Sequence, residues 1–183
     1  MIPNAKWIRP AQTTGDVCPV YSKQFSFFSS PNQSLSSVAH ATLSVTAMGV
    51  YEASLNGKRI GDFVLAPGWT SYRHRLQVQT YDVTELLSSE NELSILVGKG
   101  WYRSPLAWPD EAHRQQKAQI PAGLIALLTI TYTDGSTQLL PTGADWSAYE
   151  SNVRFSEIYD GETYDAAFDP SSAPIAIAEF DGP

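Results

Sequence analysis

The sequence predicts an all-β fold, an antiparallel β-sandwich of the jelly-roll or Greek-key type. Short runs alternate apolar and polar residues, which is the period of a half-buried strand. Turn signals separate these runs at roughly 8–12-residue intervals, as in sandwich and barrel proteins. Apolar residues do not recur at helical spacing for more than two turns anywhere in the chain. These observations together favour sheets over helices.

The first strands are the most regular. Residues 38–48 alternate apolar and polar side chains, which predicts one buried face and one solvent face, with His40 on the latter. A second alternating run, residues 50–55, leads into Asn56-Gly57. Both of these residues tolerate positive φ, so the pair predicts a tight hairpin.

Later strands are expected at residues 76–81, 93–97 and 124–132, and Asp134-Gly135 turns the last of these into another strand at 137–140. Between the first two, residues 82–87 predict a single helical turn capped by Asp82 or Thr84. Long irregular stretches are where a sandwich tends to place binding residues. We expect such stretches at Trp7–Pro19, Ala66–His74, Ser104–Pro121 and Gly143–Tyr164.

Composition limits the function classes. The 183 residues suffice for one domain with a proper core. A net charge of −7 argues against nucleic acid, which needs clustered Lys and Arg. Cys18 is the single cysteine, so no internal disulfide can form. The N-terminal residues lack the apolar core of a signal peptide, and no run is long enough for a membrane span. The expectation is therefore a cytoplasmic protein with no membrane partner.

The C-terminal composition suggests a boundary. Residues 1–168 carry the strand pattern, and Asp169–Pro174 is rich in Pro and Ser. We therefore predict a sandwich domain over residues 1–168. Residues 169–183 are expected to form a linker and the possible first strand of a following domain.

Several phrases of the sequence together resemble a known family. They are Lys6-Trp7-Ile8, Gly49–Gly57, Leu65–Tyr72 (Leu-Ala-Pro-Gly-Trp-Thr-Ser-Tyr), Gln77–Thr84, Gly98–Tyr102 and Ile158–Ala166. In this order they resemble the N-terminal β-sandwich domain of bacterial α-L-rhamnosidases, a galactose-binding-domain-like sandwich. The hairpin followed by Asp-Val-Thr also occurs in the sandwiches of β-galactosidases and β-glucuronidases. The resemblance covers nearly the whole chain.

The resemblance implies a non-catalytic accessory domain of an inverting glycoside hydrolase that releases terminal L-rhamnose. Its partners would be the downstream catalytic domain of the same polypeptide, which carries the acid and base, and rhamnose-containing glycosides. In some members such a domain binds L-rhamnose through calcium. That ligand set cannot be matched here, so no cofactor is predicted and calcium stays an open alternative. An autonomous carbohydrate-binding module is the second interpretation.

Two loops supply candidate carbohydrate-binding residues, because sugar C–H faces stack on aromatic rings and charged groups bond hydroxyls. The candidates are Trp101, Tyr102, Arg103, Trp108 and Asp110 in one loop, and Trp69 and Tyr72 in the other. The alternative interpretation is structural. The rings of the first loop would cover an open end of the sandwich, and Trp69 would plug the core edge.

Acidic residues near the C-terminus invite a catalytic interpretation. Asp160 and Glu162 on one strand face would place their carboxylates about 6–7 Å apart, near the separation in inverting glycosidases. Any two residues so spaced on a strand have this separation, so we expect a loop or a domain contact here. The three histidines show no metal-ligand spacing.

Overall fold

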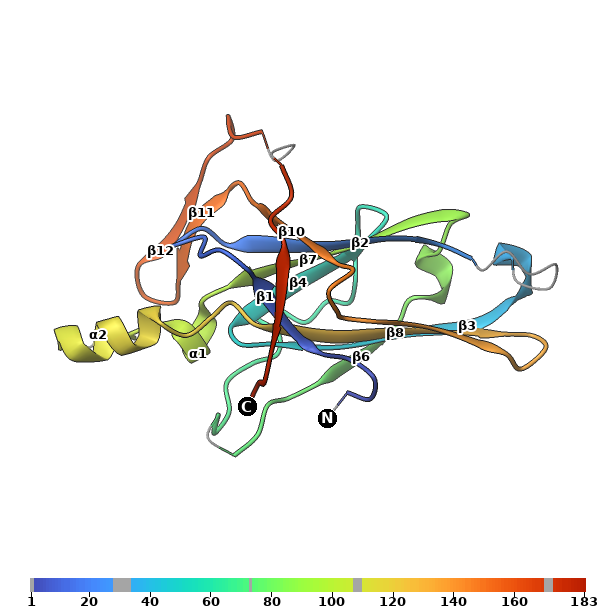
Figure 1. Cartoon of the computed structure of the whole chain (residues 1–183), viewed down its shortest axis with the longest axis horizontal. Coiled ribbons are helices and arrows are strands. Elements are labelled where there is room, and N and C mark those ends of the chain that lie inside the picture. The colour runs from blue at the N-terminus through green and yellow to red at the C-terminus, as the bar shows by residue number, and fades with distance from the viewer. Residues whose placement is uncertain (1, 28–33, 73, 107–109, 170–172) are drawn as a thin grey trace.

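The computed structural model describes residues 2–27, 34–72, 74–106, 110–169 and 173–183. Its strands form two facing antiparallel sheets, which confirms the predicted all-β sandwich (Figure 1). The first sheet has the order β13-β1-β8-β3-β6, with β9 also paired to β8. Its strands are β1 (Trp7–Pro10), β3 (Val38–Ala47), β6 (Gln79–Asp82), β8 (Leu124–Tyr132), β9 (Thr137–Pro141) and β13 (Ile177–Phe180).

The second sheet has the order β10-β2-β7-β4-β5. Its strands are β2 (Pro19–Ser26), β4 (Val50–Leu55), β5 (Lys58–Arg59), β7 (Glu90–Gly98) and β10 (Ser147–Glu150). A separate hairpin joins β11 (Val153–Glu157) to β12 (Gly161–Tyr164). Short 3₁₀ turns lie at η1 (Leu35–Ser37) and η2 (Thr84–Leu86), and two helices, α1 (Gly100–Arg103) and α2 (Glu111–Ala118), follow β7.

The core lies between the sheets and follows the predicted alternation. The apolar set of β3 is fully buried, and Leu43 and Val45 lie opposite Leu128 and Ala126 of β8. Strand β8 is buried on both faces, because Ile125 and its neighbours on the outer face are covered by the N-terminal segment around Ile2. This explains why the first half of β8, residues 124–128, is a continuous apolar run, while Thr129 and Thr131 alternate with apolar residues in the second half.

The two hairpin turn predictions are confirmed. Asn56 and Gly57 have φ of 55° and 73°, as the hairpin between β4 and β5 requires. In the other turn Gly135 donates from its backbone N to the Tyr132 carbonyl at 2.9 Å. The single helical turn is η2, but its N-cap is Val83 without a side-chain cap, so the predicted cap at Asp82 or Thr84 is wrong. Asp82 Oδ1 instead accepts a hydrogen bond from the Thr84 backbone N at 2.9 Å inside the turn. Hydrogen bonds from Thr84 lower the pKa of the exposed Asp82 carboxyl.

The C-terminal residues add to the sandwich. Strand β13 pairs antiparallel with β1, with Trp7 opposite Phe180, and Ile175 exchanges two backbone hydrogen bonds with Ala148 of β10. The segment expected to be a linker and the start of another domain thus contributes a strand to the first sheet. The boundary between residues 168 and 169 stays a prediction.

Three of the stretches expected to be irregular contain regular elements, because Trp7–Pro19 begins with β1, Gly143–Tyr164 contains β10, β11 and β12, and Ser104–Pro121 contains a helix. Within Ser104–Pro121, residues Glu111–Ala118 form α2, so the prediction is wrong for these residues. The helix buries none of its residues, so no apolar stripe in the sequence marks it. Among the described residues no helix is long and apolar enough to cross a membrane.

Candidate functional site

Strand β7 turns directly into α1 at one end of the sandwich. Gly100 has φ of 51°, and a Cβ at this position would lie 2.8 Å from the Val50 backbone N at the start of β4. The close approach of these two backbones therefore requires glycine. It places Trp101, Tyr102 and Arg103 at the rim of the second sheet.

Two of the candidate residues come together at this rim. The rings of Tyr72 and Tyr102 have centroids 4.7 Å apart and planes inclined at 53°. The Tyr72 hydroxyl donates to the Gly68 carbonyl at 3.2 Å, and Lys117 Nζ donates to the Tyr102 carbonyl at 2.9 Å. Burial raises the pKa of both phenols, so they stay neutral at ordinary pH. The two candidate loops are thus joined through their aromatic side chains.

Trp69 faces solvent, so the expectation that it plugs the core edge is wrong. Its side chain is 68% exposed, whereas Ala66 and Thr70 on either side are buried. The backbone between them is held by hydrogen bonds from the Tyr51 N to the Ala66 carbonyl at 2.6 Å and from Gln77 Nε2 to the Trp69 carbonyl at 3.0 Å. The loop is therefore tied to the sandwich while the indole points outward.

The remaining candidates take other positions. Arg103 donates from Nε to the Ile120 carbonyl at 3.1 Å, and burial lowers the pKa of its guanidinium. Asp110 is the N-cap of α2 and accepts from the Ala112 N at 3.1 Å. Trp101 is half-buried, and Trp108 lies outside the described residues. A role in carbohydrate binding stays a prediction for all seven residues.

The strand pattern did not reveal an exposed apolar surface on the loop before β6. The apolar loop surface, as we call it, consists of Phe63, Val64, Leu65, Trp69 and Val78, which are between 45% and 68% exposed. Phe63 lies close to Gly68, because a Cβ there would be 3.7 Å from the Phe63 ring. The run Phe63-Val64-Leu65 was the available sequence signal, but such a run is equally typical of a buried strand.

The acidic segment near the C-terminus forms a turn, as expected. Asp160 lies between β11 and β12, and Glu162 lies on exposed β12. Glu157 Oε2 accepts hydrogen bonds from the backbone N of Tyr159 at 2.5 Å and of Asp160 at 2.7 Å. The buried Glu157 carboxylate thus holds this turn. In the part of the chain that the structure describes, no three His, Cys, Asp or Glu residues gather as metal ligands.

Sequence comparison finds one family over most of the chain. The model of the α-L-rhamnosidase N-terminal domain matches residues 36–172. An α-L-rhamnosidase of Streptomyces avermitilis is 42% identical over 130 residues, and one of an Alteromonas species is 40% identical over 135 residues. These matches cover 70% and 72% of the chain but only 12% and 14% of the relatives.

Solved structures agree. A native rhamnosidase from Aspergillus terreus superposes over 99% of the chain and 22% of its own, with a TM-score of 0.84 and 32% identity. The Streptomyces avermitilis α-L-rhamnosidase in complex with L-rhamnose covers 90% of the chain and 16% of its own, with a TM-score of 0.76 and 34% identity. A lectin from Pleurotus ostreatus, with a TM-score of 0.55 and 19% identity over 96% of the chain and 41% of its own, shares the fold alone.

Proposed function

The chain belongs to the α-L-rhamnosidase N-terminal domain family, and from this premise we propose that it is a non-catalytic accessory domain of a glycoside hydrolase. Its role is to dock on the catalytic domain of the same polypeptide, which hydrolyses terminal α-L-rhamnose from glycosides. The short share of its relatives' length that the chain spans is consistent with one domain among several.

The apolar loop surface is the observation that carries this proposal. Val64 and Trp69 are 66% and 68% exposed, next to Phe63 and Leu65. Several large apolar side chains exposed on one loop are typical of an interaction surface. Burying a large apolar side chain contributes roughly 1.5–3 kcal/mol, so several of them suffice to hold two domains together.

The carboxylates that invited a catalytic interpretation do not share a pocketed site. Asp160 lies in the turn between β11 and β12, whose backbone donates to Glu157, and Glu162 lies on the exposed strand β12. A glycosidase acid or base must instead face the scissile bond. These positions support a catalytic pair elsewhere in the parent polypeptide.

The test uses the parent polypeptide with the pair of substitutions Phe63→Ser and Trp69→Ser. We expect a lower thermal midpoint of the parent and easier proteolytic release of this domain, because the docking surface becomes polar. Leu139→Ser, at an exposed position on β9, is the matched control and should leave both unchanged. Equal behaviour of the two variants would exclude docking through this surface. Hydrolysis of an aryl α-L-rhamnoside by the isolated chain would overturn the non-catalytic role.

An autonomous carbohydrate-binding module is the second candidate function. It is favoured by the exposed Trp69 near the Tyr72–Tyr102 pair, because sugar rings stack on such faces. The Streptomyces avermitilis relative was solved with L-rhamnose. Titrating the isolated chain with L-rhamnose, with and without calcium, separates the two functions. Saturable binding that Trp69→Ser abolishes would replace the docking role with recruitment of substrate.

A further inference from the structure

A polar pocket lies where the loop before β2 meets the segment after α2. It has a volume of 140 Å³, and Arg9, Arg103, Thr13, Gln12 and Gln119 are among its lining residues. Of the described residues that line it, none is acidic. Two guanidinium groups thus share a small space without a carboxylate, in a protein whose net charge is −7.

The two arginines keep unused donors. Arg9 Nη1 makes one long hydrogen bond, 3.4 Å, to the Pro10 carbonyl, and Arg103 uses Nε for the Ile120 carbonyl. Neither forms an ion pair within the described residues. A guanidinium carries five N–H donors in a planar fork, and that fork matches the two oxygens of a carboxylate or sulfate group. Burial lowers the pKa of Arg103, as expected where little compensates its charge.

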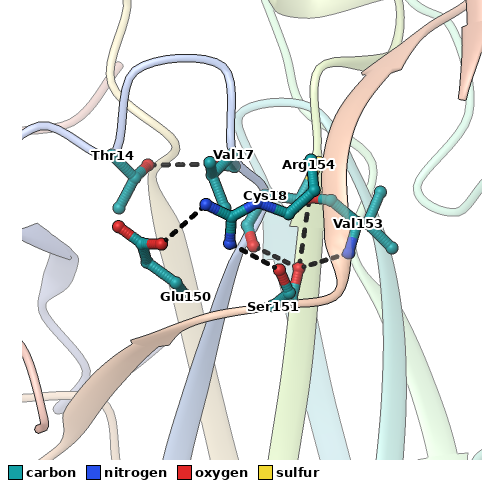
Figure 2. A network of polar contacts seen from close by, with 7 residues as sticks. All are labelled: Thr14, Val17, Cys18, Glu150, Ser151, Val153 and Arg154. Carbon is teal, nitrogen blue, oxygen red and sulfur yellow. Dashed lines mark hydrogen bonds and ion pairs between the residues drawn. The ribbon is translucent and has the colours of Figure 1, made fainter. Parts of the chain in front are cut away.

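A network of hydrogen bonds stabilises the loop that carries the pocket residues Thr13 and Thr14 (Figure 2). Thr14 Oγ1 donates to the Val17 carbonyl at 2.9 Å, and Ser151 Oγ donates to the Cys18 carbonyl at 2.6 Å. Cys18 in turn donates from its backbone N to the Val153 carbonyl at 3.0 Å. These bonds fix the loop that carries Thr13. On the other wall, the buried Tyr21 hydroxyl donates to the Ala122 carbonyl.

A second, larger pocket of 380 Å³ adjoins the first, and Thr13, Gly15, Arg103 and Ala118 line both. Its lining also includes the cationic residues Lys99, Arg114 and Lys117, the aromatic Phe155, and three acidic residues, Asp16, Glu157 and Asp160, so this pocket is of mixed charge. Lys99 is paired with Asp16 at 2.6 Å and lies over the Phe155 ring at 4.5 Å. Donors, acceptors and an aromatic side chain around a space of this size suit the hydroxyls and C–H faces of a sugar ring.

We propose that this cleft binds an anionic saccharide, with its carboxylate or sulfate group on Arg9 and Arg103 and a sugar ring in the larger pocket. Carboxylate and sulfate present the same chemistry to the guanidinium groups, namely negatively charged oxygens in one plane or face. Anion binding goes beyond the docking role. It involves none of the residues of the apolar loop surface.

The test titrates the 183-residue chain by NMR, observing backbone amides and the arginine Nε–H signals. The probes are methyl glucuronide for the carboxylate, galactose 6-sulfate for the sulfate and methyl glucoside as the neutral sugar. We expect saturable shifts of the Arg9 and Arg103 signals with at least one anionic sugar, at a dissociation constant of order millimolar. The probe that binds more tightly identifies the anionic group. The neutral glucoside should cause no saturable shift.

Variants localise the binding. Arg9→Gln and Arg103→Gln should each weaken it about tenfold, which corresponds to about 1.4 kcal/mol. Arg59→Gln, at an exposed position on β5, is the matched control and should bind as the wild type does. Arg103 packs near the core, so the Arg9 variant keeps the test valid if the Arg103 variant fails to fold. Phe63→Ser should also bind normally, which separates this site from the docking surface.

Four outcomes of the titrations with sugars and sulfate would overturn the proposal. They are equal binding of the neutral glucoside, full affinity of Arg9→Gln, inorganic sulfate binding as tightly as galactose 6-sulfate, and no saturable shift up to about 50 mM of either anionic sugar. Tighter binding of an acidic peptide than of either sugar would also overturn it, in favour of a carboxylate from a protein partner.

Discussion

At the scale of single residues, Cys18 shows how position decides chemistry. The side chain is 2% exposed and its carbonyl accepts the Ser151 hydroxyl at 2.6 Å. Burial raises the pKa of its thiol from the ordinary value of 9.0 to about 11, although the charges of Arg103 and Lys99 act in the opposite direction. The thiolate is the reactive form of cysteine, so this residue is chemically inert in the folded protein at neutral pH.

The raised pKa of Cys18 predicts a loss of stability at alkaline pH. Below about pH 9 the thiol is neutral in both states, so its contribution is fully present; the unfolded chain then loses the proton first, and the contribution disappears by about pH 11. The free energy of unfolding, measured by urea titration at about pH 7, 9 and 11, should therefore fall across this window. Cys18→Ala should show a shallower fall. An identical pH dependence of variant and wild type would contradict the assignment.

At the scale of elements, the first hairpin is more than a turn. Asn56 Nδ2 donates to the Leu86 carbonyl at 2.8 Å and to Asn91 Oδ1 at 3.0 Å, and Asn56 Oδ1 accepts from the Glu92 N at 3.0 Å. The side chain thus connects the β4–β5 hairpin to η2 and to β7. The Asn-Gly pair in the sequence predicts the turn. The side-chain hydrogen bonds of Asn56 could not be predicted, because only the fold brings η2 and β7 next to it.

Substitutions at Asn56 separate the two roles. Asn56→Gly keeps the positive φ and removes the side-chain hydrogen bonds, so it should lower the free energy of unfolding by about 1–3 kcal/mol. Asn56→Ala should cost about 1 kcal/mol more, because alanine resists the left-handed conformation. Urea titration measures the free energy of unfolding of both variants. Asp134→Ala, in the turn between β8 and β9, gives the corresponding value for a turn residue of the other hairpin. A neutral Asn56→Gly would show that the side-chain bonds contribute little.

Helix α2 shows that an element can form without a hydrophobic pattern in the sequence. Its mostly polar residues make no core contact, and its clearest sequence signal is Asp110 followed by Glu111 at the N-terminus. A helix that buries nothing cannot be found from hydrophobic periodicity. Asp110, chosen from the sequence as a sugar ligand, has a capping bond in the structure.

At the scale of the whole molecule, the surface is divided by chemistry. The apolar loop surface lies before β6. Around Arg103, the smaller pocket is lined by two arginines and by no acidic residue among the described ones, while the larger pocket has residues of both charges. Strand β13 pairs with β1 at the edge of the first sheet, and the N-terminal segment covers the outer face of β8. One small fold therefore presents a surface suited to a protein domain and a cleft suited to an anion.

The apolar loop surface also predicts self-association of the isolated chain. Exposed apolar side chains attract one another, while the net charge of −7 opposes contact between copies. Association measured by sedimentation velocity should therefore increase with salt, which screens the repulsion. Phe63→Ser with Trp69→Ser should abolish it, and Leu139→Ser should not. A chain that stays monomeric at high concentration and high salt would refute this.

The sequence by itself determined the fold class, the central strands β3, β4, β7, β8 and β9, both hairpin turns and the family, because alternation and turn chemistry are local properties of the chain. Only the tertiary structure decided which side chains meet. Tyr72 contacts Tyr102, and Arg9 shares a pocket with Arg103, although the two residues of each pair are distant in sequence. The exposure of Trp69 and the partial burial of Arg103 depend in the same way on what packs beside them. Local sequence patterns do not indicate which distant residues become neighbours. The apolar loop surface and the cleft around Arg103 could therefore be identified only from the fold.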